Sequence, residues 1–361
     1  MATPRYAPYV GGVQRHVQEL ARRVAAAGCE VTVLTTDVSG NLPREERLED
    51  VSVMRVRAWP RNRDYYFAPE VARVVAHGDW DVLHVQSYHT FVAPLAMLAA
   101  VRRNLPFVVT FHGGGHSSKL RSALRGAQLT ALRPLLRRAD RFVAIARFEI
   151  DLFGGRVGVP AERFVFIPNG SDLRRTPLPT VGHDGGTLIA SVGRLERYKG
   201  HHRILAALPH IVEHRPDVRL WIAGSGSYER ALRDLAARLG VDDRVTIEEV
   251  PSDDADAMLA RLSGASLVVL LSEYETHPIA VLEAASLGRP LLMADSSGLR
   301  ELREQGIGRT IPLWSEPVEV ARAVLEELER PQRPAIPSLP TWDDCARAHL
   351  ELYEDVIRRR S

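Results

Sequence analysis

The sequence contains little cysteine and no long hydrophobic run. Its two cysteines, Cys29 and Cys345, make no disulfide framework and show no metal-ligand spacing. None of its apolar runs reaches the roughly 18 residues that a membrane-spanning helix needs. The N-terminus, Met1 to Arg5, lacks the apolar core of a secretory signal peptide. These absences lead us to expect a cytoplasmic protein of the reducing cytosol.

The net charge is also small, but the charged residues are unevenly distributed. The formal net charge is only +2, yet residues 1–172 hold 23 Lys and Arg against 16 Asp and Glu, whereas the remainder holds 24 against 29. The first half is basic and the second is acidic, which indicates different partners for the two halves. The 361 residues exceed the length that one hydrophobic core usually serves, so we expect two domains.

Apolar runs of strand length alternate with stretches of helical period along almost the whole chain. This alternation predicts parallel sheets covered by helices, and two doubly wound α/β domains fit it best. The clearest helix is 13–27, whose apolar residues recur at helical spacing up to Gly28. The predicted strands are 30–35, 81–86, 106–111, 141–146, 163–167, 187–192, 218–223, 244–247, 266–271 and 290–293.

Two breaks in this pattern indicate the domain boundaries. A connector rich in proline and glycine occupies 173–186, so we expect a first domain over 1–172 and a second over 187–341. A second proline-rich break at 331–340 precedes a helical stretch at 342–361. We expect this last helix to pack back on the first domain.

The loop after the first strand of the second half is rich in glycine and basic residues. It runs from Gly193 and Arg194 to Lys199 and Gly200, and it opens a helix. Ligands bind outside the carboxyl ends of strands in open α/β sheets, and a helix N-terminus presents free N–H groups. Because Arg194 and Lys199 add charge-assisted hydrogen bonds, the loop suits a diphosphate. Taken alone, it is equally compatible with a solvated surface loop.

The next strand ends in a glycine-rich turn. Gly224 and Gly226 allow a backbone to approach a ligand closely, but alone they are a weak signal. The full dinucleotide pattern G-x-G-x-x-G is not present, because Arg230 and its neighbours supply no third glycine. A nicotinamide or flavin cofactor is therefore disfavoured.

Two glutamates flank a predicted helix start after a buried-looking strand. Pro278 suits the first turn of a helix, which leaves the amides of Ile279 and Ala280 free to meet an anion. Glu283 shares a helix face with Ile279, and Glu275 directly precedes the helix. A carboxylate there can accept hydrogen bonds from paired hydroxyls. Beside the basic loop, the two glutamates predict a site for sugar or ribose diols.

These motifs together resemble the donor site of the glycosyltransferase family 4 enzymes, which have the GT-B fold. Glu275 and Glu283 are separated by seven residues, with the basic loop upstream. The similarity covers nearly the whole chain. Its other landmarks are Gly11 to Val13, Asp81 to His84, Phe111 to Gly113, Pro168 to Asp172, Gly224 to Gly226, Gly288 to Pro290 and Gly298 to Glu301.

The resemblance implies two Rossmann-like domains facing each other across a cleft, with the C-terminal helix returning to the N-terminal domain. It also implies retaining transfer of a sugar from a nucleotide-diphosphate donor, UDP- or GDP-linked, without an obligatory metal. The donor would be a co-substrate, and no other cofactor is expected. The acceptor would be a glycan, a lipid-linked hydroxyl or a small-molecule hydroxyl.

The resemblance further implies a role for each matching residue. Arg194 and Lys199 would hold the diphosphate and neutralise the leaving group. Glu283 would bind the ribose hydroxyls and Glu275 the hydroxyls of the donor sugar. His112 would lie over the sugar near the reacting carbon, which makes His112, Glu275, Arg194 and Lys199 the predicted catalytic set. The other predicted donor-binding residues are Gly11, Gly12, Asn169, Gly193, Gly224, Gly226, Val250, His277, Pro278, Ile279 and Ala280.

The sequence departs from the family pattern in three places. The first strand of the N-terminal sheet is largely absent, and its loss would expose backbone groups of the neighbouring strands. His277 and Pro278 replace a glycine-containing turn, which would alter the donor sugar that fits. Glu248 to Pro251 stands where many members have a glycine-containing turn near the nucleobase.

A basic amphipathic helix is predicted within residues 119–138. Such a helix can lie on an anionic membrane or meet a lipid-linked acceptor, although a core-facing helix with a solvated basic face fits slightly better. The segment lacks the interleaved aromatic residues of a nucleic-acid platform, so no nucleic-acid partner is expected. The histidines are scattered without metal-like pairing, so no metal site is expected either.

Two other functions remain compatible with these residues. A nucleotide-sugar epimerase on the same two-domain plan would need a base flanking the sugar and no acceptor. A nucleotide-sugar-binding scaffold that had lost catalysis would bind the donor without transferring it.

Overall fold

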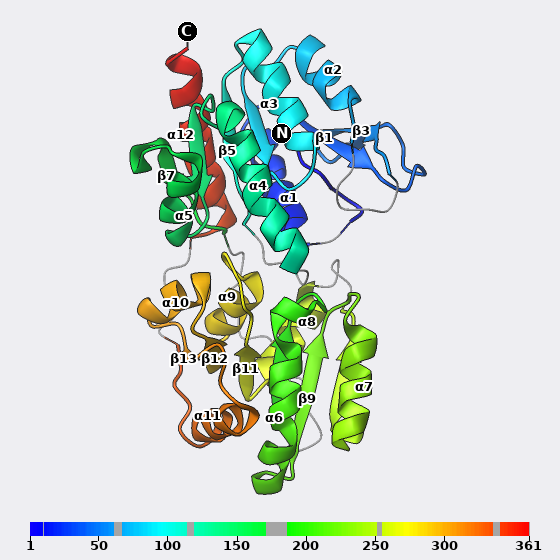
Figure 1. Cartoon of the computed structure of the whole chain (residues 1–361), viewed down its shortest axis with the longest axis vertical. Coiled ribbons are helices and arrows are strands. Elements are labelled where there is room, and N and C mark those ends of the chain that lie inside the picture. The colour runs from blue at the N-terminus through cyan, green and yellow to red at the C-terminus, as the bar shows by residue number, and fades with distance from the viewer. Residues whose placement is uncertain are drawn as a thin grey trace. The chain divides into compact units, whose positions relative to one another are not determined.

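The computed structural model divides into two compact units (Figure 1). Unit 1 takes in the described residues of 1–113, 120–170 and 340–360, and unit 2 takes in those of 186–334. Of the predicted connector 173–186, only Gly186 lies among the described residues. The structure describes residues 1–9, 11–60, 67–113, 119–170, 186–250, 255–334 and 340–360, without the side chains of 119–125 and 255–256.

Unit 1 is built around a mainly parallel sheet. Its order is β2-β3-β1 in one part and β4-β5-β6-β7 in the other, and only β2 runs antiparallel to its neighbour. The apolar runs of β4, β5 and β6 are buried on both faces, which is typical of parallel strands covered by helices. The strands are β1 (Val31–Asp37), β2 (Glu45–Leu48), β3 (Val51–Arg57), β4 (Leu83–Gln86), β5 (Phe107–Thr110), β6 (Arg141–Ala144) and β7 (Phe164–Phe166).

The first residues of the chain join the two parts of this sheet. Ala2 forms parallel bridges to Leu34 of β1 and to Val85 of β4. The Ala2 amide donates to the oxygen of His84 at 2.8 Å, and the Leu34 amide donates to the oxygen of Met1 at 2.8 Å. The strand that the sequence predicts to be largely absent is thus represented by three residues, which satisfy backbone groups of both neighbours.

Helices cover the unit 1 sheet, and the last helix of the chain belongs to this unit. α12 (Trp342–Arg358) packs against α1 (Gly12–Ala26) (Figure 1). Thr341 and Asp344 form a capping box at its start. Its buried face includes Trp342 and Tyr353. The other helices of unit 1 are α2 (Glu70–His77), α3 (Val92–Arg103), α4 (Lys119–Leu136) and α5 (Phe148–Val157).

Unit 2 contains a fully parallel sheet in the order β10-β9-β8-β11-β12-β13. The central strands β8, β9, β11 and β12 are almost wholly buried, as their apolar runs predict. The strands are β8 (Thr187–Val192), β9 (Val218–Ala223), β10 (Val245–Glu248), β11 (Leu267–Leu270), β12 (Leu291–Ala294) and β13 (Arg309–Ile311). The helices are α6 (His201–His214), α7 (Glu229–Leu239), α8 (Ala255–Gly264), α9 (Ile279–Ser286), α10 (Ser297–Glu304) and α11 (Pro317–Glu329).

The two doubly wound α/β units agree with the fold predicted from the sequence, and each of the ten predicted strands is present. Three strands were not predicted, namely β2, β3 and β13. β2 lies beside β3 with alternately exposed side chains, and β13 is a three-residue strand at the end of its sheet. No helix in the described ranges is long and apolar enough to cross a membrane.

Gly200 offers a test of how closely the loops of unit 2 approach one another. Its φ is 76°, and a Cβ there would lie 2.0 Å from the carbonyl oxygen of Leu271. Gly240 has a similar φ of 66°, but no atom lies within 4 Å of its added Cβ. We expect Gly240→Ala to lower the free energy of unfolding by about 1 kcal/mol, from backbone strain alone. Gly200→Ala should lower it by about 3 kcal/mol or more, because strain and overpacking add.

Urea unfolding of both variants measures the difference in the free energy of unfolding. Hydrogen exchange of the α6 and α9 amides in the folded variants shows where the stability is lost. Equal losses of stability in the two variants would show that the loop after β8 does not depend on the contact with Leu271.

Candidate active site

The strand order of unit 2 reverses next to β8. From β8 the chain adds β9 and β10 on one side, and then it crosses to place β11, β12 and β13 on the other side. In open parallel sheets, ligands bind in the crevice at such a reversal, outside the carboxyl ends of the two strands. The loops after β8 and β11 contain Lys199 and Glu275. The topology therefore brings these two predicted residues to one place.

Lys199 and Glu275 form an ion pair at this reversal. The Lys199 ammonium donates to both carboxylate oxygens of Glu275, at 2.7 and 2.8 Å. The hydroxyl of Ser272 lies 2.8 Å from Glu275 Oε1, and Glu275 is only 7% exposed. A pair this poorly solvated is a weak source of stability, because removing two charges from water offsets much of their attraction. It lies at the carboxyl ends of the strands beside the reversal, the edge where ligands bind in open parallel sheets.

Side-chain contacts of His201 and Tyr198 hold the loop after β8 in place. The Nδ1 atom of His201 lies 2.8 Å from the hydroxyl of Ser191, and burial lowers the pKa of His201 to about 4. Arg194 is exposed and donates to the hydroxyl of Tyr198 at 2.6 Å, whereas Lys199 lies over the Tyr198 ring at 5.5 Å. The two predicted phosphate-binding cations thus share Tyr198 as a neighbour.

The glycines after β9 permit close packing between loops. A Cβ on Gly224 would lie 2.1 Å from the oxygen of Gly193, and one on Gly226 would lie 2.5 Å from the oxygen of Leu195. These contacts account for both glycines without a ligand. They also place the turn directly beside the basic loop. Val250, which follows β10, is half-buried and packs against the core of unit 2.

Helix α9 begins at Ile279, with Pro278 as its N-cap. Among the described residues, no hydrogen bond uses the amide of Ile279 or Ala280. Glu283, one turn further along, is 8% exposed. Burial lowers the pKa of His277 to about 4, and within the described ranges its buried Nδ1 atom has no hydrogen-bond partner. The helix start therefore presents two amides and a neutral imidazole at the same edge as the ion pair.

In unit 1, the predicted residues meet around a histidine that was not predicted. Gly11 is the N-cap and Gly12 the first residue of α1, and His16 lies one turn further along, fully buried. The Nδ1 atom of His16 lies 2.8 Å from the Oδ1 atom of Asn169. The His16 ring meets the His112 ring edge-on, with the centroids 4.8 Å apart. His16 thus brings Asn169 and His112 together at the start of α1.

Four imidazoles form a buried cluster in unit 1, those of His16, His84, His112 and His349. Burial lowers the pKa of His16 to about 4 and that of His349 to about 3. The pKa values of His84 and His112 lie well below the usual value for the same reason. All four rings are neutral at pH 7, so each has one N–H donor and one acceptor nitrogen.

Comparison with known proteins identifies the family. Residues 10–175 match the family model described as Glycosyltransferase Family 4, and residues 180–334 match the one described as Glycosyl transferases group 1. A glycogen synthase of Mycobacterium tuberculosis is 32% identical over 330 residues, which cover 83% of this chain and 78% of that protein. The chain belongs to glycosyltransferase family 4.

Other relatives agree with this glycosyltransferase assignment. A D-inositol 3-phosphate glycosyltransferase of Thermobispora bispora is 28% identical over 396 residues, covering 97% of this chain and 91% of that protein. The structure of Anabaena HepE in complex with UDP and glucose matches with a TM-score of 0.70 at 20% identity, covering 99% of this chain and 96% of that chain. The structural likeness shows the fold, which is GT-B.

Sequence analysis missed four residues around the predicted sites of this glycosyltransferase, namely His16, Gln86, Tyr198 and Ser272. A signal existed for His16, because it lies four positions before Leu20 on the apolar face of α1. A polar residue on a buried helix face needs a partner, which makes it a candidate. Gln86 ends a predicted strand, where ligand-binding side chains gather. Ser272 directly follows the predicted strand 266–271, so the same signal applies to it, whereas no comparable signal marked Tyr198.

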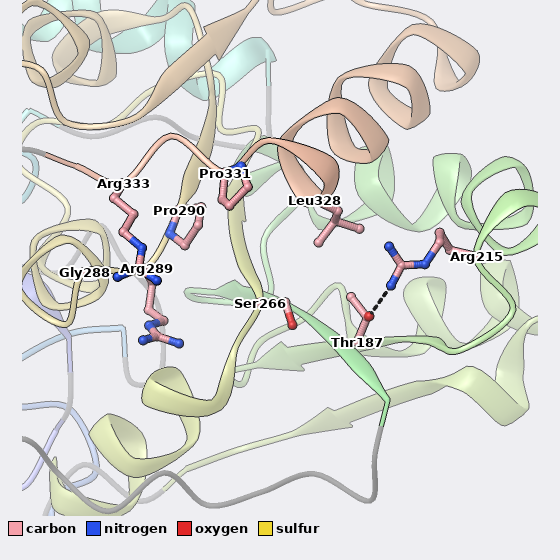
Figure 2. Close-up of a pocket in the computed structure, with 9 residues that line it drawn as sticks. All are labelled: Thr187, Arg215, Ser266, Gly288, Arg289, Pro290, Leu328, Pro331 and Arg333. Carbon is pink, nitrogen blue, oxygen red and sulfur yellow. Dashed lines mark hydrogen bonds between the residues drawn. The ribbon is translucent and has the colours of Figure 1, made fainter.

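A cavity of about 240 Å³ lies at the opposite edge of the unit 2 sheet, beside the amino ends of β8, β11 and β12 (Figure 2). Arg215 donates to Thr187 at 2.7 Å and pairs with Asp217 at 3.0 Å. Arg215 and Arg289 lie on different sides of the cavity in Figure 2, so their charges do not converge on one point. This cavity is therefore not the predicted donor site. Its lining residues are Thr187, Arg215, Ser266, Gly288, Arg289, Pro290, Leu328, Pro331 and Arg333.

The basic segment 119–138 lies largely in α4. Of its described leucines, Leu129, Leu132 and Leu136 are buried and Leu135 is half-buried. Arg137 donates to the oxygen of Val157 at 3.1 Å. These residues serve packing within unit 1, and membrane contact stays a prediction. Across the described part of the chain, no group of three or more His, Cys, Asp or Glu side chains is placed to hold a metal ion.

The buried imidazoles should make unit 1 sensitive to acid. The pKa of His349 is about 3 in the folded chain and returns to about 6.5 on unfolding, so between these values only the unfolded chain binds the proton. The stability contribution is complete above pH 6.5 and is lost as the pH falls. At pH 4 this loss should reach roughly 3 kcal/mol for His349 alone. Hydrogen exchange of the α12 amides between pH 7 and pH 4 measures it.

His349→Phe should reduce this loss, because the aromatic ring stays and the titrating group is removed. His77→Phe is a matched control, since both Nδ1 atoms lie near the carbonyl oxygen four residues earlier, at 2.9 Å for His77 and 2.8 Å for His349. His77 is exposed and lies outside the buried imidazole cluster, so its replacement controls for the loss of a histidine with the same local contact. An unchanged slope in His349→Phe would contradict the neutral buried state.

Proposed function

We propose that this glycosyltransferase moves a sugar from a UDP- or GDP-linked donor to a hydroxyl acceptor, with retention of the anomeric configuration and without a metal. The acceptor belongs to the class of glycans, lipid-linked hydroxyls and small-molecule hydroxyls. One observation carries the proposal. Lys199 and Glu275 form a poorly solvated ion pair at the strand reversal of unit 2, where the GT-B relatives support a donor site.

The ion pair supplies two groups that suit the two ends of the donor. The Lys199 ammonium can leave Glu275 for a diphosphate oxygen, because both are anionic acceptors of similar charge-assisted hydrogen bonds. The carboxylate oxygens that it releases can then accept from the hydroxyls of the donor sugar. Donor binding on this view exchanges one ion pair for two sets of contacts. The complex of Anabaena HepE with UDP and glucose supports UDP as the nucleotide.

Charge development in the reaction explains why cations lie on the phosphate side. Cleavage of the bond to the sugar places negative charge on the leaving diphosphate and positive charge on the sugar ring. Lys199, Arg194 and the free amides at the start of α9 meet the first charge, in place of a divalent cation. Glu283 holds the ribose hydroxyls, and His112 acts at the sugar.

The role of Glu275 can be tested against a neighbouring glutamate. We expect Glu275→Gln to reduce transfer by about 100-fold or more, because an amide cannot take over the anionic contacts. Lys199→Ala should abolish transfer by leaving the diphosphate without its cation. Glu273→Gln is the matched control, since Glu273 pairs with Arg203 at 3.1 Å and not with Lys199. Transfer rates of the three variants, with circular dichroism as a check of the fold, measure this difference.

Near-normal turnover in Glu275→Gln would overturn the donor-site proposal. The same assay separates the alternative functions, because NMR of the product reports the anomeric configuration. An isomerised sugar from donor alone would indicate an epimerase. Donor binding without hydrolysis or transfer would indicate a binding scaffold. Transfer that stops when EDTA is added would contradict metal independence.

A further inference from the structure

The backbone at His112 is held in an uncommon conformation. His112 follows β5 with a φ of 45°, in the left-handed region that side chains rarely adopt. The next amide, of Gly113, donates to the buried carboxylate of Glu149 at 3.2 Å. A non-glycine residue persists in this region only where its surroundings fix it. The direction of the His112 side chain is therefore determined by the fold.

Gln86 determines which nitrogen of His112 carries the proton. Gln86 ends β4 and is 0% exposed, and its Oε1 atom lies 2.5 Å from the Nε2 atom of His112. An amide oxygen can only accept a hydrogen bond, so the Nε2 atom of His112 must be the donor. None of the hydrogen bonds among the described residues uses the Nδ1 atom of His112.

The Gln86 amide also contacts a second buried histidine, His84. The Gln86 Nε2 atom lies 3.2 and 3.3 Å from the two ring nitrogens of His84, so the amino group contacts that ring and the oxygen faces His112. His84 is held at both ends, by the Tyr353 hydroxyl at 2.6 Å and by Thr110 Oγ1 at 2.7 Å. Burial keeps the Tyr353 phenol protonated, and a neutral hydroxyl can either donate to or accept from Nδ1 of His84.

The surroundings of His112 also keep its ring uncharged. The groups that face it are the imidazoles of His16 on α1, His89 after β4 and His349 on α12, together with the Gln86 amide. Burial and these three imidazoles hold the pKa of His112 well below its usual value. A neutral ring with its proton on Nε2 has a lone pair on Nδ1.

We propose that Gln86 is a positioning residue that fixes His112 as the neutral Nε2–H tautomer, so that Nδ1 is the acceptor that the ring offers to the substrate. The consequence of this tautomer for catalysis rests on the proposed function. A neutral imidazole can accept a hydrogen bond from a sugar hydroxyl, and it does not repel the positive charge that develops on the sugar ring. An imidazolium at the same place would oppose that charge.

Two substitutions of Gln86 distinguish the effect of losing the hydrogen-bond acceptor from the effect of adding a negative charge. Gln86→Met keeps a similar volume but removes the acceptor, so the tautomer is no longer fixed. We expect kcat to fall roughly 10- to 100-fold while the KM for the donor changes little. Gln86→Glu keeps the acceptor but adds a negative charge, which favours the imidazolium. The acidic limb of its pH–rate profile should then move to higher pH. Gln18→Met and Gln18→Glu, on the exposed face of α1, are matched controls.

The direct readout is the nitrogen NMR spectrum of the imidazoles in the full-length protein, with His112→Gln used to assign the His112 signals. In the wild type we expect a protonated Nε2 and an unprotonated Nδ1 for His112 at pH 7. In Gln86→Met a mixture of tautomers should appear, and in Gln86→Glu the His112 pKa should rise. A proton on Nδ1 in the wild type would overturn the proposal, as would a tautomer and pKa that neither substitution changes.

These results do not depend on the assigned activity. If the tautomer is as expected but no donor supports transfer, the proposed function fails and the assignment of Gln86 stands. If transfer proceeds while His112 carries its proton on Nδ1, only the assignment of Gln86 fails. If a Gln86 variant does not fold, a proton on Nδ1 in the wild-type spectrum still overturns the assignment of Gln86.

Discussion

The bidentate contact between the Lys199 ammonium and the Glu275 carboxylate connects the loops on both sides of the strand reversal in unit 2. It depends on a close approach of backbones, because Gly200 contacts the carbonyl of Leu271 where no Cβ would fit. It also depends on Ser297, whose hydroxyl accepts from the Glu275 amide at 2.8 Å. A cation and an anion are thus kept in a poorly solvated place at the ligand-binding edge. Such a pair is a weak source of stability, because removing two charges from water offsets much of their attraction.

Unit 1 contains a cluster of four buried histidine rings that carry no charge at pH 7. Burial of four histidine rings between α1, the ends of β4 and β5, and α12 lowers their pKa values, so hydrogen bonds alone determine where each proton lies. The C-terminal helix takes part through Tyr353 and His349. The helix therefore supplies neighbours to the buried imidazoles as well as packing to unit 1.

The sequence predicted the parts of this structure that arise from local patterns. Strands such as Thr187–Val192 are apolar on both faces, and the loops that follow them carry the basic and acidic motifs, so the positions of Lys199 and Glu275 could be inferred. β2 was missed because its exposed positions carry charge and only one face is covered. The pairing of Lys199 with Glu275 depends on side-chain geometry, which no motif specifies. Likewise, His16 and Asn169 are 153 positions apart and meet only through the fold.

A crystal structure of this glycosyltransferase with UDP-glucose bound would test the role of the ion pair most directly. We expect the Lys199 ammonium within about 3 Å of a diphosphate oxygen, with the Glu275 carboxylate accepting from a hydroxyl of the sugar. The nucleotide should lie at the carboxyl ends of β8 and β11. A nucleotide bound elsewhere on unit 2, or a donor bound there while Lys199 still donates to both oxygens of Glu275, would contradict the exchange of partners that we propose.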